Sequence, residues 1–203
     1  MFEREKTLEA LAFFQSRVRK AGHLKLLKLL FYLDLLHFRQ TGRSVTGLDY
    51  EAWPMGPVPR SLWEEIKTPG SALSEHFEVT GSEAIEEPAQ VDAEGGIRDA
   101  YTRHVPGQLI PKRPYQHLYL SRREHKLAEE LAEIFANSDA AEMSEVSHNQ
   151  AGPWRVALQK GGHATPVNML EGEVGLGRPD MMAPPQELAE RVAEYLEVKE
   201  LLR

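Results

Sequence analysis

The sequence contains no cysteine among its 203 residues. This absence excludes disulfide bridges, zinc sites with cysteine ligands and catalysis by a thiol. No apolar run approaches the roughly 18 to 20 residues that a membrane-spanning helix needs. The amino terminus, MFEREKTLEA, is charged and lacks the apolar segment of a secretory signal. We therefore expect a cytoplasmic protein without a membrane partner, folded as a single domain over residues 1–203.

Motifs for the common kinds of catalysis are also missing. The sequence has neither a GxSxG serine-hydrolase motif nor an HExxH zinc motif. Its stretch GEVGLG, residues 172–177, lacks the Lys-Ser/Thr that follows in a phosphate-binding loop. The eight histidines are scattered without the spacing of metal ligands. We expect no enzyme activity, no metal ion and no cofactor.

Acidic residues outnumber basic ones, 31 to 24, which gives a formal net charge of −7. Such a balance disfavours binding to the phosphate backbone of nucleic acids. The most basic stretch, residues 103–117, contains three prolines and follows an acidic segment, so we interpret it as a solvated loop edged by strands. We therefore do not expect a nucleic-acid partner.

Apolar residues at helical spacing dominate the chain. The segment 23–42 is apolar on nearly every side except for a narrow stripe that contains Lys25, Lys28 and Arg39, and this pattern predicts a buried central helix. Ser121 and Glu124 have the spacing of a capping box. Further helices are expected over residues 3–20, 59–67, 121–138, 140–149, 152–162 and 185–203.

Short strands are expected between these helices. Residues 44–53, 76–80 and 107–110 favour extended structure, whereas residues 81–99 are acidic, poor in large apolar side chains and expected to form a mobile insert. The sum is an α+β fold, a mostly helical single domain around a buried central helix with a few short strands.

The stretch WPMGPVP, residues 53–59, places three prolines and a glycine within seven residues. Proline fixes φ near about −65° and has no amide donor, whereas glycine permits a turn. We expect a rigid turn outside any strand ladder, with Trp53 beside it. Rigid turns with an aromatic side chain suit partner binding because little conformational entropy is lost on association.

Asp34 lies on the apolar side of the central helix, one turn before His37. A catalytic pair would need a nucleophile, a metal or a phosphate-binding loop, and a metal site would need a second ligand cluster; no motif indicates any of these. The favoured interpretation is a structural polar core in which Asp34 accepts hydrogen bonds from loop backbone. The proline turn is the loop we expect it to bind.

Two blocks of sequence resemble the Panacea domain, the SocA-like antitoxin family. The first is KLLKLLFYLDLLHFRQTGRSVTGLDYEAWPMGPVP, residues 25–59, and the second is MSEVSHNQAGPW, residues 143–154. The resemblance runs from about residue 22 to residue 160. It implies a non-catalytic protein of a bacterial or phage two-gene module, which binds and neutralises a protein toxin encoded by the adjacent gene.

The resemblance also implies where to look for the toxin contact. We expect it at the proline turn, with two aromatic side chains further along the chain as additional candidates: Trp53, Met55, Gly56, Pro57, Val58, Trp154 and Tyr195. Some family members deliver the toxin to a protease, so an adaptor role stays open, as does self-association through the last helix. Two alternatives belong to other functional classes: a DNA-binding regulator of the operon, and an enzyme that uses Asp34 and His37.

Overall fold

The computed structural model describes residues 2–87, 90–91, 97–98, 101–105, 107–138, 143, 152–175 and 181–201. Its helices are α1 (Glu3–Arg17), α2 (His23–Thr41), α3 (Arg60–Lys67), the 3-10 helix η1 (Ala72–Glu75), α4 (Arg122–Ile134), α6 (Pro153–Gly161) and α7 (Pro185–Leu201). The predicted α+β, mostly helical class is confirmed. Apart from Met143, which is helical, the helix expected over 140–149 lies outside the described residues. Within the described ranges, no helix is long and apolar enough to cross a membrane.

The strands are short and form small antiparallel sheets. They are β1 (Glu51–Trp53), β2 (Gly56–Val58), β3 (Phe77–Val79), β4 (Glu83–Glu87), β5 (Gln90–Val91), β6 (Ile97–Arg98), β7 (Tyr101–Val105), β8 (Leu109–Pro111) and β9 (Thr165–Pro166). The orders are β2-β1-β9, β3-β8, β4-β7 and β5-β6. The strands expected within 76–80 and 107–110 are confirmed as β3 and β8.

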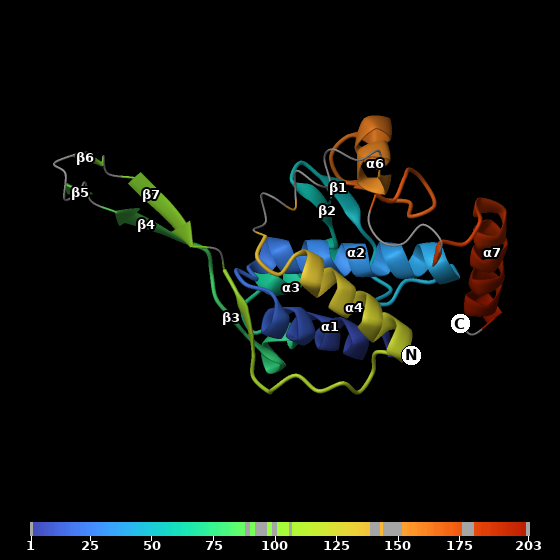
Figure 1. Ribbon diagram of the computed structural model, residues 1–203, viewed down its shortest axis with the longest axis horizontal. Coiled ribbons are helices and arrows are strands. Elements are labelled where there is room, and N and C mark those ends of the chain that lie inside the picture. Colours follow the sequence, from blue (N-terminus) through green and yellow to red (C-terminus); the bar gives the residue numbers. More distant parts are fainter. Residues whose placement is uncertain are drawn as a thin grey trace.

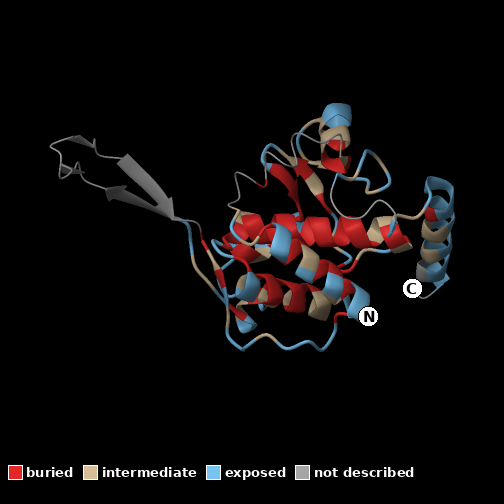
Figure 2. Ribbon diagram, viewed as in Figure 1, coloured by how far each residue is buried: buried red, intermediate tan, exposed pale blue. Residues whose placement is uncertain are grey.

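Helix α2 is the centre of the molecule, as its apolar sequence predicts. It lies between α1 and α4 on one side and the β1–β2 hairpin with α6 on the other (Figure 1). Figure 2 shows it buried along most of its length. The helix ends at Thr41 and is capped by Gly42, which has a left-handed φ of 78° and donates its amide to the carbonyl of Phe38. A side chain at this position would be strained.

The polar stripe of α2 faces protein instead of solvent. Lys25 is completely buried, and its ammonium group donates to the carbonyls of Arg19, Phe135 and Ser138 at 2.7, 2.8 and 2.5 Å. Arg19 follows the end of α1, and Phe135 and Ser138 follow the end of α4. One lysine therefore joins the ends of two neighbouring helices to α2.

The capping box predicted for α4 is confirmed. The Ser121 hydroxyl accepts the amide of Glu124, and the Glu124 carboxylate accepts the amide of Ser121 at 2.6 Å. The same carboxylate contacts the ammonium group of Lys6 at 2.5 Å. The cap therefore also ties the start of α4 to α1.

The expectation that residues 53–59 would lie outside any strand ladder is wrong. Strand β2 pairs with β1 in a hairpin whose register places Trp53 opposite Gly56 and Ala52 opposite Pro57. Among the described strands, β2 is at the edge of its sheet. Proline is tolerated there because an edge strand has no second neighbour that needs its missing amide.

The acidic segment 81–99 contains paired strands. Strand β4 pairs with β7 over five residues, and this ladder projects away from the helical body (Figure 1). Strands β5 and β6 also pair, whereas residues 88–89, 92–96 and 99–100 lie outside the described part of the chain. The mobility expected for this segment stays a prediction.

Helix α7 packs on the C-terminal end of α2. Its Arg191 guanidinium donates to the carbonyl of Gln40 at 2.7 Å, and its Leu188 is buried. The guanidinium carbon of Arg43 lies 5.1 Å from the centre of the Tyr195 ring. Polar and cation–π contacts therefore hold this helix, together with one apolar anchor.

We expect Lys25→Met to lower the free energy of unfolding by about 3 kcal/mol, because three carbonyl oxygens lose a charged donor and that of Phe135 stays buried. Urea unfolding followed by circular dichroism measures the change. The matched control is Lys126→Met on the exposed face of α4, which should shift stability by less than about 0.5 kcal/mol. Equal effects of the two substitutions would contradict a structural role for Lys25.

Candidate partner-binding site

A lysine of α2 fixes the turn of the β1–β2 hairpin. Pro54 and Met55 are exposed at its tip, and the Lys28 ammonium group donates to the carbonyl of Met55 at 2.5 Å. Gly56 has a φ of 126°, and a Cβ atom there would lie 3.0 Å from the Lys28 nitrogen. The backbone conformation therefore favours glycine strongly, and the approach of the lysine leaves little room for a side chain.

Lys28 keeps its charge in a mostly dry environment. Burial lowers the pKa of Lys28 to about 8, and its side chain is only 3% exposed. At neutral pH the ammonium form still predominates. A buried cation therefore lies against the turn and binds the carbonyl of Met55 at its tip.

A second contact fixes the hairpin from the side of α6. The indole nitrogen of Trp154, at the start of α6, donates to the carbonyl of Trp53 at 2.9 Å. The amide of Ala164 donates to the carbonyl of Ala52, also at 2.9 Å. The Trp154 ring is buried against Ala52 in a small apolar cluster. The hairpin is therefore held from two directions, and its outer surface is left to solvent.

Three aromatic rings gather on that outer surface. Trp53 meets Trp63 of α3 edge to face, with ring centres 6.2 Å apart at 74°. The centre of the His163 ring lies 5.5 Å from that of Trp53. The rings border a shallow pocket of about 360 Å³, whose lining also includes four charged side chains: Glu51, Arg60, Glu64 and Lys67. We call Trp53, Pro54, Met55, Trp63 and His163 the hairpin face.

The residues expected to contact a partner divide into two groups. Met55 is 56% exposed and Trp53 is half-buried, so both present surface to a partner. Gly56, Pro57 and Val58 are buried and shape the turn, and their expected contact with a partner stays a prediction.

Trp154 and Tyr195 lie outside the hairpin face. Trp154 is 5% exposed and supports the hairpin from within, and its expected contact with a partner stays a prediction. Tyr195 is half-buried on α7 against Arg43. Trp63 and His163 were not expected at this site, because neither belongs to a local motif. Only the packing of α3 and of the residues before β9 brings them to Trp53.

Asp34 is fully buried and binds the segment that precedes the hairpin. One carboxylate oxygen accepts the amides of Val45 and Thr46 at 2.7 and 2.8 Å. The other accepts the hydroxyl of Tyr50 at 2.7 Å and that of Thr46. The expectation that Asp34 binds loop backbone is met, but the loop is 45–50 and not the proline turn, which offers a carbonyl to Lys28 instead.

His37 serves a different contact from Asp34. Its Nδ1 atom lies 2.7 Å from the carbonyl of Arg43, so this nitrogen carries the proton and donates. Burial lowers the pKa of His37, which favours the neutral ring. Within the described residues, no group of three His, Asp or Glu side chains is placed to hold a metal ion.

A family model described as the antitoxin SocA-like, Panacea domain, matches residues 26–155. The matched part includes almost all of α2, the loop bound by Asp34, the hairpin, α3, α4 and the start of α6 with Trp154. No curated protein and no solved structure gives a significant match.

The buried carboxylate makes stability depend on pH. Burial raises the pKa of Asp34 to about 6, against the opposing effect of its hydrogen bonds to Thr46, Tyr50 and Val45. The native state then holds the Asp34 proton more tightly than the unfolded state does. The contribution of this proton to the free energy of unfolding is therefore complete below about pH 4 and is lost as the pH rises through 6.

We therefore expect the free energy of unfolding of the wild type, relative to Asp34→Asn, to fall by about 2 to 3 kcal/mol between pH 4 and pH 7. Urea titrations of both proteins at four pH values measure it, and the subtraction removes groups that the two proteins share. A difference that grows with pH would mean that the hydrogen bonds outweigh burial and hold the pKa below its ordinary value.

Proposed function

The chain belongs to the SocA-like Panacea antitoxin family, and we propose that it neutralises a protein toxin by binding it directly through the hairpin face. The observation that carries this proposal is the exposed Met55 at the tip of a turn whose carbonyl is held by buried Lys28. The toxin would be the product of the adjacent gene. No catalytic step is proposed for the antitoxin.

Rigidity supports the choice of this surface. The turn carries prolines, is fixed by Lys28 and Trp154, and loses little conformational entropy when a partner covers it. Tryptophan is enriched among the residues that dominate binding energy, and Trp53 and Trp63 lie side by side here. Methionine adapts to irregular partner surfaces because its side chain is flexible and polarisable.

The negative charge of the chain supports a partner with a basic surface. The chain carries a formal net charge of −7. A toxin that acts on RNA or on nucleotides needs a basic surface for phosphate groups, and an acidic antitoxin complements such a surface. Covering that surface would block the toxin without any chemistry by the antitoxin.

The test uses co-expression with the product of the adjacent gene, with growth and co-purification as readouts. We expect wild-type protein to restore growth and to co-purify with the toxin. Met55→Asp should weaken the purified complex by about tenfold or more, because a carboxylate would be buried at the centre of the contact. Isothermal titration calorimetry gives the Kd.

The matched control is Met181→Asp, which changes another exposed methionine, 40% exposed and outside the hairpin face. It should leave the Kd within about twofold of the wild type, as expected for a surface change away from the contact. Equal losses from both variants, or none from either, would contradict binding through the hairpin face. Rescue of growth without a complex would contradict direct neutralisation and favour delivery to a protease or repression of the operon.

A further inference from the structure

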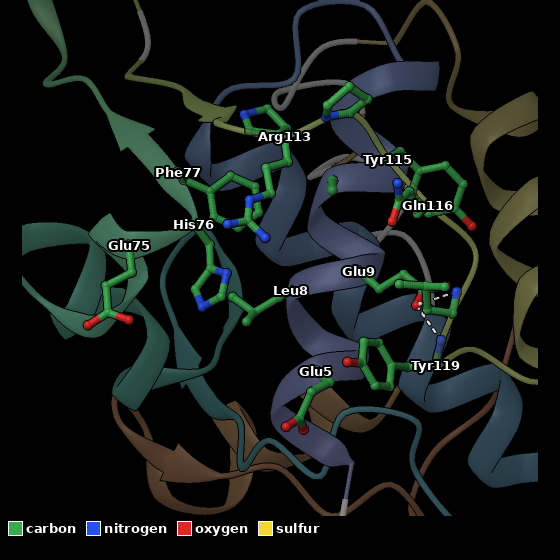
Figure 3. Close-up of a pocket in the computed structure, with 14 residues that line it drawn as sticks. Glu5, Leu8, Glu9, Glu75, His76, Phe77, Arg113, Tyr115, Gln116 and Tyr119 are labelled. Atoms are coloured by element: carbon green, nitrogen blue, oxygen red, sulfur yellow. Dashed lines mark hydrogen bonds between the residues drawn. The ribbon is translucent and has the colours of Figure 1, made fainter.

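A second hollow lies on another side of the molecule and shares no residue with the hairpin face. It is a groove of about 510 Å³ between α1, the segment Glu75–Phe77 and the chain from Pro111 to Tyr119 (Figure 3). Leu8, Ala12 and Phe77 contribute apolar lining. The volume is in the range of sites that take small ligands or a few residues of a peptide.

The walls of this groove are fixed by hydrogen bonds. The buried carboxylate of Glu9 accepts the amides of Leu118, Tyr119 and Leu120 at 3.1, 2.5 and 3.3 Å. This contact holds one wall on α1, and Figure 3 draws the bond from Tyr119. The opposite wall is joined by the amide of Lys112, which donates to the carbonyl of His76 at 2.9 Å. The groove is therefore built into the fold.

Large apolar side chains are exposed along the rim. Leu118 is 66% exposed, Phe2 is 54% exposed and Tyr119 is 43% exposed. The rings of Phe2 and Tyr119 lie 5.9 Å apart, so they form one surface. Apolar side chains gathered beside a hollow mark an interaction site, whereas single exposed ones do not.

Acidic and basic side chains are unevenly distributed along the groove. Glu5 and Glu75 add carboxylates, whereas Glu9 is already matched by three amides. Arg113 lies at the opposite end from Glu5 (Figure 3). A ligand that places a cation near Glu5 and a carbonyl or carboxylate near Arg113 would match both ends, and this polarity would fix its direction.

We propose that this groove binds an extended segment of a partner protein in which a lysine or arginine stands next to a large apolar residue. The apolar side chain lies on Leu8 and Phe77, and the basic group is bound by the carboxylates of Glu5 and Glu75. This contact is separate from the hairpin face and does not depend on the toxin proposal.

The experiment selects the ligand from a display library of random octapeptides, using the purified full chain as bait. Enriched peptides are synthesised with a fluorescein label and titrated by fluorescence anisotropy at low and at physiological salt. We expect lysine or arginine within two positions of leucine, phenylalanine or tryptophan, and a Kd that rises with salt because ion pairs at a partly open site are screened.

Two variants test the location. Leu118→Asp and the double variant Glu5→Gln/Glu75→Gln should each raise the Kd by about tenfold, the scale of one well-placed contact. The controls are Glu78→Gln and Ile134→Asp, exposed positions outside the groove, which should leave the Kd within about twofold. Met55→Asp should also leave it unchanged, which separates this proposal from the hairpin face.

Other outcomes would overturn the proposal. These are a library that shows no enrichment, enriched peptides that are acidic, or binding that Leu118→Asp leaves intact. Sedimentation velocity of the wild type and Leu118→Asp adds a further criterion: a dimer that only the wild type forms would assign the groove to a second copy of this chain.

Discussion

Buried polar side chains on α2 that bind the backbone of other segments are the constraint on which this structure depends. Lys25, Lys28 and Asp34 are almost completely removed from water. Burying a charge without compensation costs several kcal/mol, so each of these groups must be satisfied by hydrogen bonds of good geometry. The described contacts supply them from backbone groups, with added side-chain hydroxyls for Asp34. Burial of the apolar surface of α2 stabilises the fold, whereas its three buried charged groups fix the positions of the segments that they bind.

This arrangement explains why a single helix can organise the candidate site. Along α2, Lys25 holds the ends of α1 and α4, Lys28 holds the hairpin turn, and Asp34 holds the segment that leads into the hairpin. The turn presents the carbonyl of Met55 to α2. An ammonium group suits this position because it donates hydrogen bonds and accepts none. The segment 45–50 offers amides and hydroxyls, for which a carboxylate is suitable. The buried ammonium groups therefore meet backbone carbonyls, and the buried carboxylate meets backbone amides.

Much of the fold could be predicted from local patterns. The capping box at Ser121, the glycine stop at Gly42 and the apolar spacing of the helices are short-range signals. The helices that they indicate are observed, except that the one expected over 140–149 lies outside the described residues apart from Met143. Asp34 could be assigned a backbone-binding role because a carboxylate on an apolar face needs donors. Its actual partner loop could not, because the choice depends on which segment reaches α2 from the other side.

Other features needed the tertiary structure. Pro57 excludes a central strand but not an edge strand, and only the sheet order decides between them. The burial of Gly56, Pro57 and Val58 follows from the docking of the hairpin on α2, which leaves Pro54 and Met55 exposed at the tip. Trp63 reaches Trp53 only because α3 folds back beside the hairpin, and His163 reaches it from a segment far away in the sequence. The groove beside α1 likewise arises from Glu9 binding the amides of residues 118–120.

The most direct test of this account is residue-resolved amide hydrogen exchange by NMR on the wild type and on Lys28→Met. Methionine keeps most of the side-chain volume but removes the donor to the Met55 carbonyl, so a change reports the contact instead of a void. We expect faster exchange confined to the β1–β2 hairpin, with the protection of α2 and α4 unchanged, because local opening then needs less free energy. Unchanged protection across residues 51–58 would contradict the claim that the buried charges of α2 hold the candidate site in place.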